Sequence, residues 1–154
     1  MTIEINQKAP DFTINATGNQ DISLSQFLGQ KVVLYFYPKD NTSGCISEGK
    51  DFRDYYSKFI QHNAVVLGVS RDSIKSHENF KEKHQFPFEL LSDKDETLCK
   101  LYDVIKLKKL YGKEHMGIER STFIINETGI LVKEWRKVKV KQHVEEVIQA
   151  LETL

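Results

Sequence analysis

The chain has 154 residues, which predicts one compact domain over residues 1–154. Hydrophobic residues make up 40% and charged residues 29% of the chain, an ordinary globular composition that argues against wholesale disorder. Lysine plus arginine and aspartate plus glutamate number 22 each, so the formal net charge is zero and neither nucleic acid nor a membrane is expected as a partner.

The first half of the chain alternates between strand and helix patterns. Apolar and β-branched runs predict four strands, at residues 11–14, 21–24, 31–37 and 64–69. The first two flank a turn at Thr17-Gly18-Asn19 and predict an N-terminal hairpin. The third is a continuous apolar run, typical of a strand buried on both faces, and it stops at Pro38. Aromatic residues at helical spacing predict a helix from about Cys45 to Ile60.

The second half adds short elements and a closing helix. Ser73 can cap a helix that runs to about Gln85 and ends before Pro87. The other predicted elements are a strand at 88–91, a short helix through Tyr102, a hairpin of strands at 121–126 and 130–138, and an amphipathic helix from His143 to about Leu154. The basic segment 106–113 is expected to be an exposed loop that could border a pocket.

This alternation of elements predicts an α/β sandwich with one central sheet. In such sheets the carboxyl ends of buried parallel strands are the natural place for chemistry. Residues 38–45 follow the first buried strand and lie at one such end. The loop at 38–45 is therefore the first candidate for a functional site.

Cys45 follows a polar turn and lies near the first turn of a predicted helix. Unpaired backbone N–H groups and the helix dipole favour an anion there, so its thiol should ionise more readily than usual and give the reactive thiolate. Thr42 offers a hydroxyl that could act as helix cap, thiolate partner or substrate donor. A small buried residue that packs the start of a helix explains Cys45 equally well on position alone.

The segment Phe36-Tyr-Pro-Lys-Asp-Asn-Thr-Ser-Gly-Cys45 resembles the active-site segment of the peroxiredoxins, whose signature is Pro-x-x-x-Thr-x-x-Cys. The residues Tyr-Pro-Lys-Asp-Asn-Thr within this segment, and Phe52-Arg53-Asp54 after it, most resemble the bacterioferritin comigratory protein / peroxiredoxin Q branch of these AhpC/TSA-like enzymes. Further matches follow in order at residues 67–70, 90–93 and 120–125. The resemblance therefore extends across nearly the whole chain.

The resemblance implies a thioredoxin-like α/β fold, with a central mixed β-sheet flanked by helices and an N-terminal β-hairpin extension. It implies that Cys45 is the peroxidatic cysteine, with Pro38, Thr42 and Arg120 completing the pocket. Arg120 carries a fixed charge and a planar fork of donors that would stabilise the thiolate and polarise a peroxide oxygen. Pro38 would shield the thiolate from water and hold the loop.

Glu48 lies one helical turn past Cys45. A carboxylate that faced the sulfur would oppose its ionisation. We therefore expect Glu48 to orient an arginine, either Arg120 or Arg53.

The implied activity is that of a thiol-dependent peroxidase. It would reduce hydrogen peroxide and organic hydroperoxides to water and alcohols through a Cys45 sulfenic acid, with thioredoxin or another thiol as the reductant. No cofactor or metal is expected, and the histidines are expected to be isolated surface residues because they form no metal-ligand spacing with the cysteines. A monomer is favoured over a dimer.

The resolving cysteine of many relatives is absent. Its usual place, five residues after the peroxidatic cysteine, is Lys50, and residues 79–83 on the next helix hold no cysteine either. Only Cys99 remains, in an apolar setting that is typical of a buried structural thiol. A one-cysteine mechanism is favoured, and a Cys45–Cys99 disulfide is the alternative.

Other functions remain open at this point. A thioredoxin-like thiol–disulfide oxidoreductase needs a Cys-x-x-Cys pair, and position 48 is Glu. A chaperone or redox-sensing adaptor would keep Cys45 as a sensor without turnover. Two cysteines, the lack of an apolar core in residues 1–10 and the shortness of the apolar runs favour a cytoplasmic protein with reduced thiols.

Overall fold

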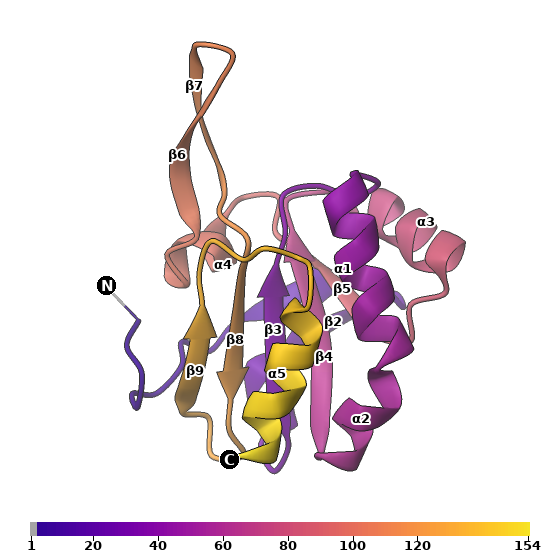
Figure 1. The fold of residues 1–154 in the computed structure, drawn as a ribbon, viewed down its shortest axis with the longest axis vertical. Coiled ribbons are helices and arrows are strands. Elements are labelled where there is room, and N and C mark those ends of the chain that lie inside the picture. The colour runs from indigo at the N-terminus through magenta and orange to yellow at the C-terminus, as the bar shows by residue number, and fades with distance from the viewer. Residues whose placement is uncertain (1–2) are drawn as a thin grey trace.

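The computed structural model describes residues 3–154, which are built around a seven-stranded sheet (Figure 1). The order of its strands is β2-β1-β5-β4-β3-β8-β9. Strands β3, β4 and β5 run parallel, whereas β8, β9 and the β1–β2 hairpin pair antiparallel with their neighbours. The strands are β1 (Thr13–Ala16), β2 (Gln20–Ser23), β3 (Lys31–Phe36), β4 (Ala64–Ser70), β5 (Glu89–Ser92), β8 (Ser121–Ile125) and β9 (Leu131–Trp135). The thioredoxin-like α/β fold, with its mixed central sheet and N-terminal hairpin, is confirmed.

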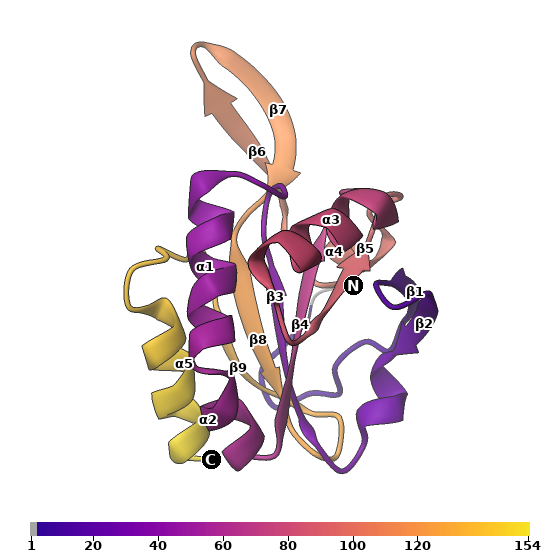
Figure 2. The same cartoon turned by 90° about the vertical axis from the view of Figure 1, so that its right-hand side faces the viewer.

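The helices are short and lie on both faces of the sheet (Figure 2). They are the 3-10 helix η1 (Leu24–Phe27) and the α-helices α1 (Ser43–Asp54), α2 (Tyr56–Gln61), α3 (Ile74–His84), α4 (Thr97–Leu101) and α5 (His143–Glu152). None of these helices, within residues 3–154, has the length and apolar character of a membrane span.

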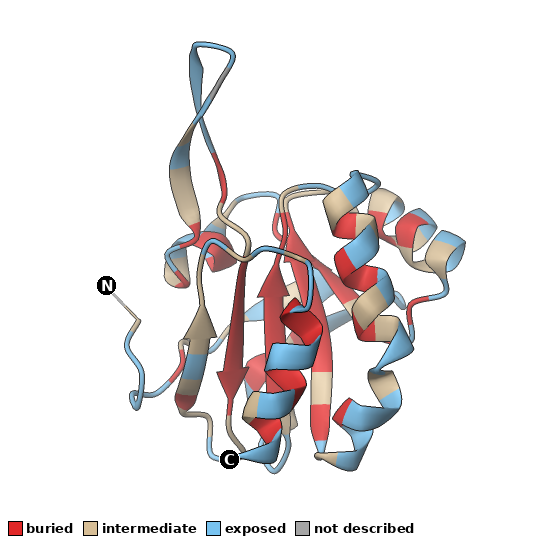
Figure 3. Ribbon diagram, viewed as in Figure 1, coloured by how far each residue is buried: buried red, intermediate tan, exposed pale blue. Residues whose placement is uncertain are grey.

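Strand β3 shows why the central strands are continuously apolar. Val32, Leu34 and Phe36 pack into one core with residues of η1 and α4. Val33 and Tyr35 pack into a second core with residues of α1, α2, α3 and α5. Because successive side chains of a strand point to opposite faces, both sets must be apolar when helices cover both sides. Figure 3 shows the resulting buried centre along β3, β4 and β8.

The predicted helix from Cys45 to Ile60 is wrong in one respect, because the structure divides it into α1 and α2 at Tyr55. The Tyr55 hydroxyl donates a hydrogen bond to Glu145 on α5 at 3.4 Å. No glycine or proline lies between residues 50 and 60, so the sequence carries no local signal for the break. Phe52 and Phe59 nevertheless both reach the second core, as their spacing predicted.

The helix predicted after Ser73 is confirmed by its caps. The hydroxyl oxygen of Ser73 accepts a hydrogen bond from the N–H of Ser76 at 3.1 Å, which satisfies one of the free donors at the start of α3. Gln85 ends the helix in the left-handed conformation, with a φ of 55°.

The expectation of a basic loop at residues 106–113 is wrong. This segment forms most of a two-stranded hairpin, β6 (Ile105–Leu110) and β7 (Lys113–Ile118), which extends beyond the main sheet (Figure 1). Tyr111 and Gly112 connect the strands with φ values of 52° and 77°, the left-handed pair that a tight hairpin turn requires. The turn at Tyr111 and Gly112 therefore allows this lysine-rich segment to pair as a hairpin, although its polar composition is typical of a loop.

The expectation that all histidines lie at the surface is also wrong. His77 and His143 are buried, with exposed fractions of 0% and 3%. Both find polar partners inside the fold, because Nε2 of His143 is 2.8 Å from the Thr122 hydroxyl and both ring nitrogens of His77 are hydrogen-bonded. A buried polar group is tolerated when such partners are available.

Candidate active site

Cys45 lies where the sequence predicted the site, beyond the carboxyl end of β3. A loop leads from β3 into α1, and Cys45 is the third residue of that helix. Its exposed fraction is only 2%. The sulfur is therefore held inside the fold, with the first turn of the helix around it.

The start of α1 provides backbone donors with no partner inside the helix. Its first hydrogen bond runs from the N–H of Ile46 to the carbonyl of Thr42 at 2.9 Å. The N–H groups of Ser43, Gly44 and Cys45 precede that bond and keep their partial positive charge. This end of the helix dipole favours a negative charge near Cys45.

Arg120 brings its charge to the sulfur from a distant part of the chain. It directly precedes β8, and its carbonyl accepts a hydrogen bond from the N–H of Val138 at 3.0 Å. Its Nη2 donates to Cys45 Sγ at 3.3 Å, and its Nη1 donates to Glu48 Oε1 at 2.7 Å. The planar guanidinium thus spans the thiol and the carboxylate.

Glu48 orients Arg120, one of the two arginines expected for that role. Arg53, the other, pairs with Asp54 and donates to the carbonyl of His84. Glu48 is fully buried, and burial raises its pKa to about 7 although Arg120 acts in the opposite direction. Among residues 3–154, its second carboxyl oxygen finds no hydrogen-bond partner.

The charge of Arg120 is retained in this setting. Burial works against the guanidinium, but Glu48 and Cys45 outweigh that effect and leave the pKa of Arg120 raised. The site therefore pairs a sulfur with a permanent cation in a partly dry environment.

Gly44 leaves room for this approach of Arg120, which the sequence interpretation missed. A Cβ atom at Gly44 would lie 3.2 Å from Arg120 Nη2, closer than side chains normally pack. The glycine directly before Cys45 was the available signal, since glycine is used where two groups approach closely.

Thr42 and Pro38 lie on the same loop as Cys45. Thr42 is the N-cap residue of α1, but its hydroxyl donates to the carbonyl of Lys39 at 2.8 Å and caps no helix N–H. The suggested cap role is therefore wrong. The hydroxyl proton is directed to Lys39 and not to the sulfur or to a substrate position, as the suggested donor roles require, while the hydroxyl oxygen keeps the ability to accept from a substrate. Pro38 is half-buried at the start of the loop.

Lys108 is a cation near the site that the sequence interpretation did not single out. It is half-buried on β6, whereas its neighbour Lys109 is exposed. Burial lowers the pKa of Lys108, and the charges of Arg120 and Arg71 lower it further while Cys45 raises it. The charges of Arg120 and Cys45 thus act on Lys108, and alternation along β6 separates Lys108 from the exposed Lys109.

A second polar cluster lies beneath the loop, where Asp40, Asp72 and His77 bring potential ligand atoms within 4.8 Å of one another. Each of the ligand atoms that converge there is hydrogen-bonded within the protein. Internal bonds therefore account for this cluster without an ion. No sequence spacing signalled it, because Asp40 lies far along the chain from Asp72 and His77.

Cys99 is separate from the site. Both cysteines are free thiols, and Cys99 is buried on α4 with its N–H donating to Asp93 Oδ2 at 2.7 Å. Burial, and then Asp93, raise the pKa of the Cys99 thiol strongly. Cys99 is thus a structural thiol in its present position.

Comparison with known proteins points in one direction. The AhpC/TSA family profile matches residues 5–134. Peroxiredoxin Bcp of Bacillus subtilis (strain 168) is 54% identical over 154 residues, which cover 100% of this chain and 98% of that protein.

Solved structures agree with this similarity. PrxQ of Xylella fastidiosa, solved as a cysteine-to-serine mutant, superimposes with a TM-score of 0.93 at 46% identity and covers 98% of this chain and 96% of its own. The bacterioferritin comigratory protein of Xanthomonas campestris gives a TM-score of 0.88 at 47% identity over 92% of this chain and 90% of its own.

Proposed function

This chain belongs to the AhpC/TSA family and is a peroxiredoxin, a thiol peroxidase, and on that premise we propose that Cys45 is its peroxidatic cysteine. The observation that carries the proposal is the 3.3 Å contact between Arg120 Nη2 and Cys45 Sγ at the start of α1. A fixed cation and the helix N-terminus both stabilise the thiolate, which is the reactive form of cysteine.

The proposed reaction is an in-line displacement on the peroxide. The Cys45 thiolate attacks one oxygen, so an S–O bond forms as the O–O bond breaks, and sulfur becomes a sulfenic acid. The departing oxygen leaves as hydroxide or alkoxide and takes a proton to give water or an alcohol. Arg120 and the N–H groups of the first turn stabilise the charge that develops on the oxygens.

Thr42 and Pro38 are proposed to complete the site. Because the Thr42 O–H is directed to the carbonyl of Lys39, its oxygen is available to accept the O–H of a bound hydroperoxide. Pro38 has no N–H and lies half-buried, and it would limit access of water to the sulfur.

The proposed substrates are hydrogen peroxide and organic hydroperoxides. The similar protein from X. campestris has alkyl peroxide reduction activity, which supports the organic class. The enzyme also requires a thiol reductant, and we propose an external one such as thioredoxin, in a one-cysteine cycle. Two observations support this cycle. The usual resolving position on α1 is Lys50 and not a cysteine, and the second cysteine, Cys99, lies on α4.

The proposal also covers the form in which the protein works. We propose one domain over residues 1–154, because one sheet joins strands from both ends of the chain. A monomer is favoured over a dimer. Light scattering on the protein as it elutes from a size-exclusion column would measure its mass in solution. Two free thiols fit a reducing, cytoplasmic setting.

Steady-state peroxide consumption tests the function. We expect turnover with thioredoxin, glutaredoxin or dithiothreitol as reductant, and the loss of turnover in Cys45→Ser with an unchanged circular dichroism spectrum. Peroxide consumption that persists in Cys45→Ser would show that another group carries the reaction.

A further inference from the structure

Asp40 is a buried carboxylate on the loop that leads from β3 to Cys45. Its side chain is 1% exposed, yet it is surrounded by hydrogen-bond donors. Oδ1 accepts from the Tyr37 hydroxyl at 2.6 Å, and Oδ2 accepts from the Ser76 hydroxyl at 2.8 Å. Oδ2 also lies 2.7 Å from Nδ1 of His77. The loop is thereby joined to α3.

His77 extends this connection to the sheet. Its Nε2 lies 2.9 Å from the carbonyl oxygen of Leu91 on β5. A carbonyl only accepts, so Nε2 carries a proton, and one further proton is shared between Nδ1 and Asp40 Oδ2. Both ring nitrogens are used, and the imidazole bridges the loop and β5.

The backbone of the loop is tied down at the same place. The N–H of Asp40 donates to Asp72 Oδ2 at 2.9 Å. Asp72 in turn follows β4, and its carbonyl accepts from the Ser92 hydroxyl at 2.6 Å. The middle of the loop is thus anchored to the segment after β4, to α3 and, through His77, to β5.

This anchoring bears on both halves of the catalytic cycle. Arg120 reaches Cys45 from the connection before β8, so the contact between them depends on where the loop places the start of α1. After oxidation, a thiol must reach a sulfur that starts from 2% exposure. The first turn of α1 must then move away from its packed position.

We propose that Asp40 and His77 are positioning residues that hold Cys45 against Arg120 for attack on peroxide and restrain the movement that exposes oxidised Cys45 to the reductant. The inference rests on the proposed function of Cys45. In the exposed state a thiol R–SH attacks the sulfenic sulfur, an S–S bond forms, the S–O bond breaks and water leaves. A second thiol then releases R–S–S–R and restores Cys45.

Two substitutions at His77 separate its two hydrogen bonds. In His77→Gln the side-chain amide occupies the place of Nε2, so the bond to Leu91 remains and the link to Asp40 is lost. In His77→Asn the amide occupies the place of Nδ1, so the link to Asp40 remains. The two variants change the same residue and differ in whether the hydrogen bond to Asp40 is kept.

The two half-reactions are measured separately. The rate of peroxide attack follows from competition with a reference peroxidase, and the rate of sulfenic acid reduction follows from quenched mass spectrometry with 2-mercaptoethanol as the thiol. In His77→Gln we expect attack to slow about tenfold, as a displaced nucleophile should, and reduction to become several-fold faster. His77→Asn loses only the bond to Leu91, so both of its rates should change less than those of His77→Gln.

Opposite movement of the two rates distinguishes positioning from a loss of stability. Leu151→Ala, in the second core on α5, lowers stability without touching the loop and should leave both rates unchanged. If His77→Gln folds poorly, Ser76→Ala removes one bond to the same carboxylate and should give the same pattern more weakly. The inference is overturned if reduction of the sulfenic acid is no faster in His77→Gln, in which the link to Asp40 is lost. Turnover in the parent protein would still support the proposed function.

Discussion

Cys45 and Cys99 pack against opposite faces of the central sheet. Cys45 lies in the core that contains Val33 and Tyr35, whereas Cys99 lies in the core that contains Val32 and Leu34. A disulfide requires Cα atoms within about 7 Å of each other. Both thiols are buried in separate cores, so pairing them would require at least one cysteine to leave its core.

Treatment with one equivalent of peroxide should therefore leave no intramolecular disulfide. We expect a Cys45 sulfenic acid, or its adduct with the added thiol, on a non-reducing gel and in the mass spectrum. Cys99→Ser should keep the parent rate of peroxide consumption within about twofold, since mutations that are remote from the site usually act independently of it. A Cys45–Cys99 disulfide in high yield would contradict the one-cysteine cycle.

Replacement of Arg120 by Met should remove most of the activity. Loss of a preorganised donor to a developing anion typically costs about 10²- to 10³-fold in rate, and we expect that range for the second-order reaction with peroxide. Arg120→Lys keeps a positive charge but loses the planar fork of donors. Its rate with peroxide should lie between the rates of Arg120→Met and the parent protein. Arg53→Met is the control. Arg53 pairs with Asp54, so its replacement should leave the rate unchanged.

Gly44→Ala should separate stability from activity. Alanine in place of glycine in a helix adds about 0.5–1 kcal/mol where space allows. The new Cβ would lie 3.2 Å from Arg120 Nη2 and shift the guanidinium from Cys45. We expect a several-fold slower reaction with peroxide and a melting temperature close to that of the parent, because the gain in helix stability and the displacement of Arg120 from Glu48 act in opposite directions. An unchanged rate would show that Arg120 can shift without consequence.

Glu48 should make stability depend on pH. Its pKa in the fold is raised to about 7 by burial, against an ordinary value of 4.5, so the folded state holds this proton more tightly. The stability it contributes is fully present below about pH 4.5 and is lost as the pH rises through about 7, with a total effect of roughly 3 kcal/mol.

Urea unfolding of the parent and Glu48→Gln between pH 5 and 8 measures this effect. The stability of the variant relative to the parent should increase with pH over that range. Comparison with the variant isolates Glu48 from His143, whose pKa is lowered to about 4 by burial and then by Arg120, and which acts in the opposite sense. A constant difference between the two proteins would show that Glu48 stays ionised.

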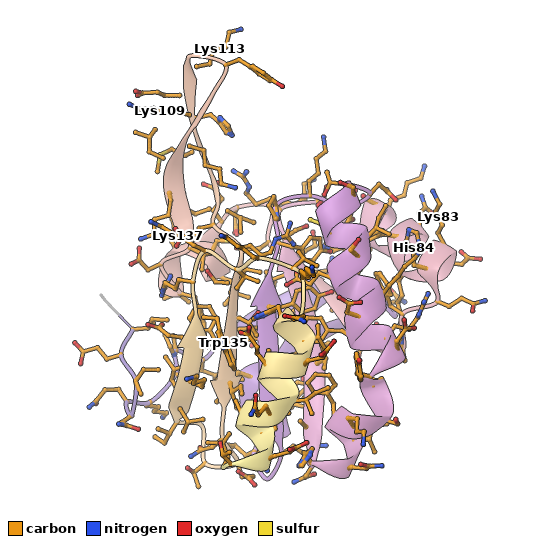
Figure 4. All side chains as sticks on the ribbon, in the orientation of Figure 1. Lys83, His84, Lys109, Lys113, Trp135 and Lys137 are labelled. Carbon is orange, nitrogen blue, oxygen red and sulfur yellow. The ribbon has the colours of Figure 1, made fainter. Side chains whose placement is uncertain are left out.

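Lys108→Met should slow the reaction with peroxide moderately. Its ammonium lies near enough to Arg120 and Cys45 for their charges to affect its pKa, so its loss removes positive potential at the site. A cost of roughly 1 kcal/mol, or about fivefold in rate, is expected for one partly screened charge. Lys109→Met is the matched control, since Lys109 is an exposed residue on the same hairpin (Figure 4) and pairs with Glu114 at 3.5 Å. Equal effects of both substitutions would indicate a general role of hairpin charge.

The elements were largely predictable because their signals are local. The apolar run of β3, the turn residues after it and the helix that follows each depend on neighbours a few residues apart. Placement of Cys45 at the start of α1 followed from that order alone. The hairpin of β6 and β7 was missed because its lysines suggested a loop, although Gly112 carried a turn signal.

The sequence by itself determined the order of elements, the place of Cys45 and the family resemblance. Only the tertiary structure decided that Glu48 pairs with Arg120 and not with Arg53, that His77 bridges the loop and the sheet, and that Cys99 lies on the far face. The physical reason is distance along the chain. Backbone periodicity is set by adjacent residues, whereas the partner of a buried charge is whichever group the packed sheet brings beside it.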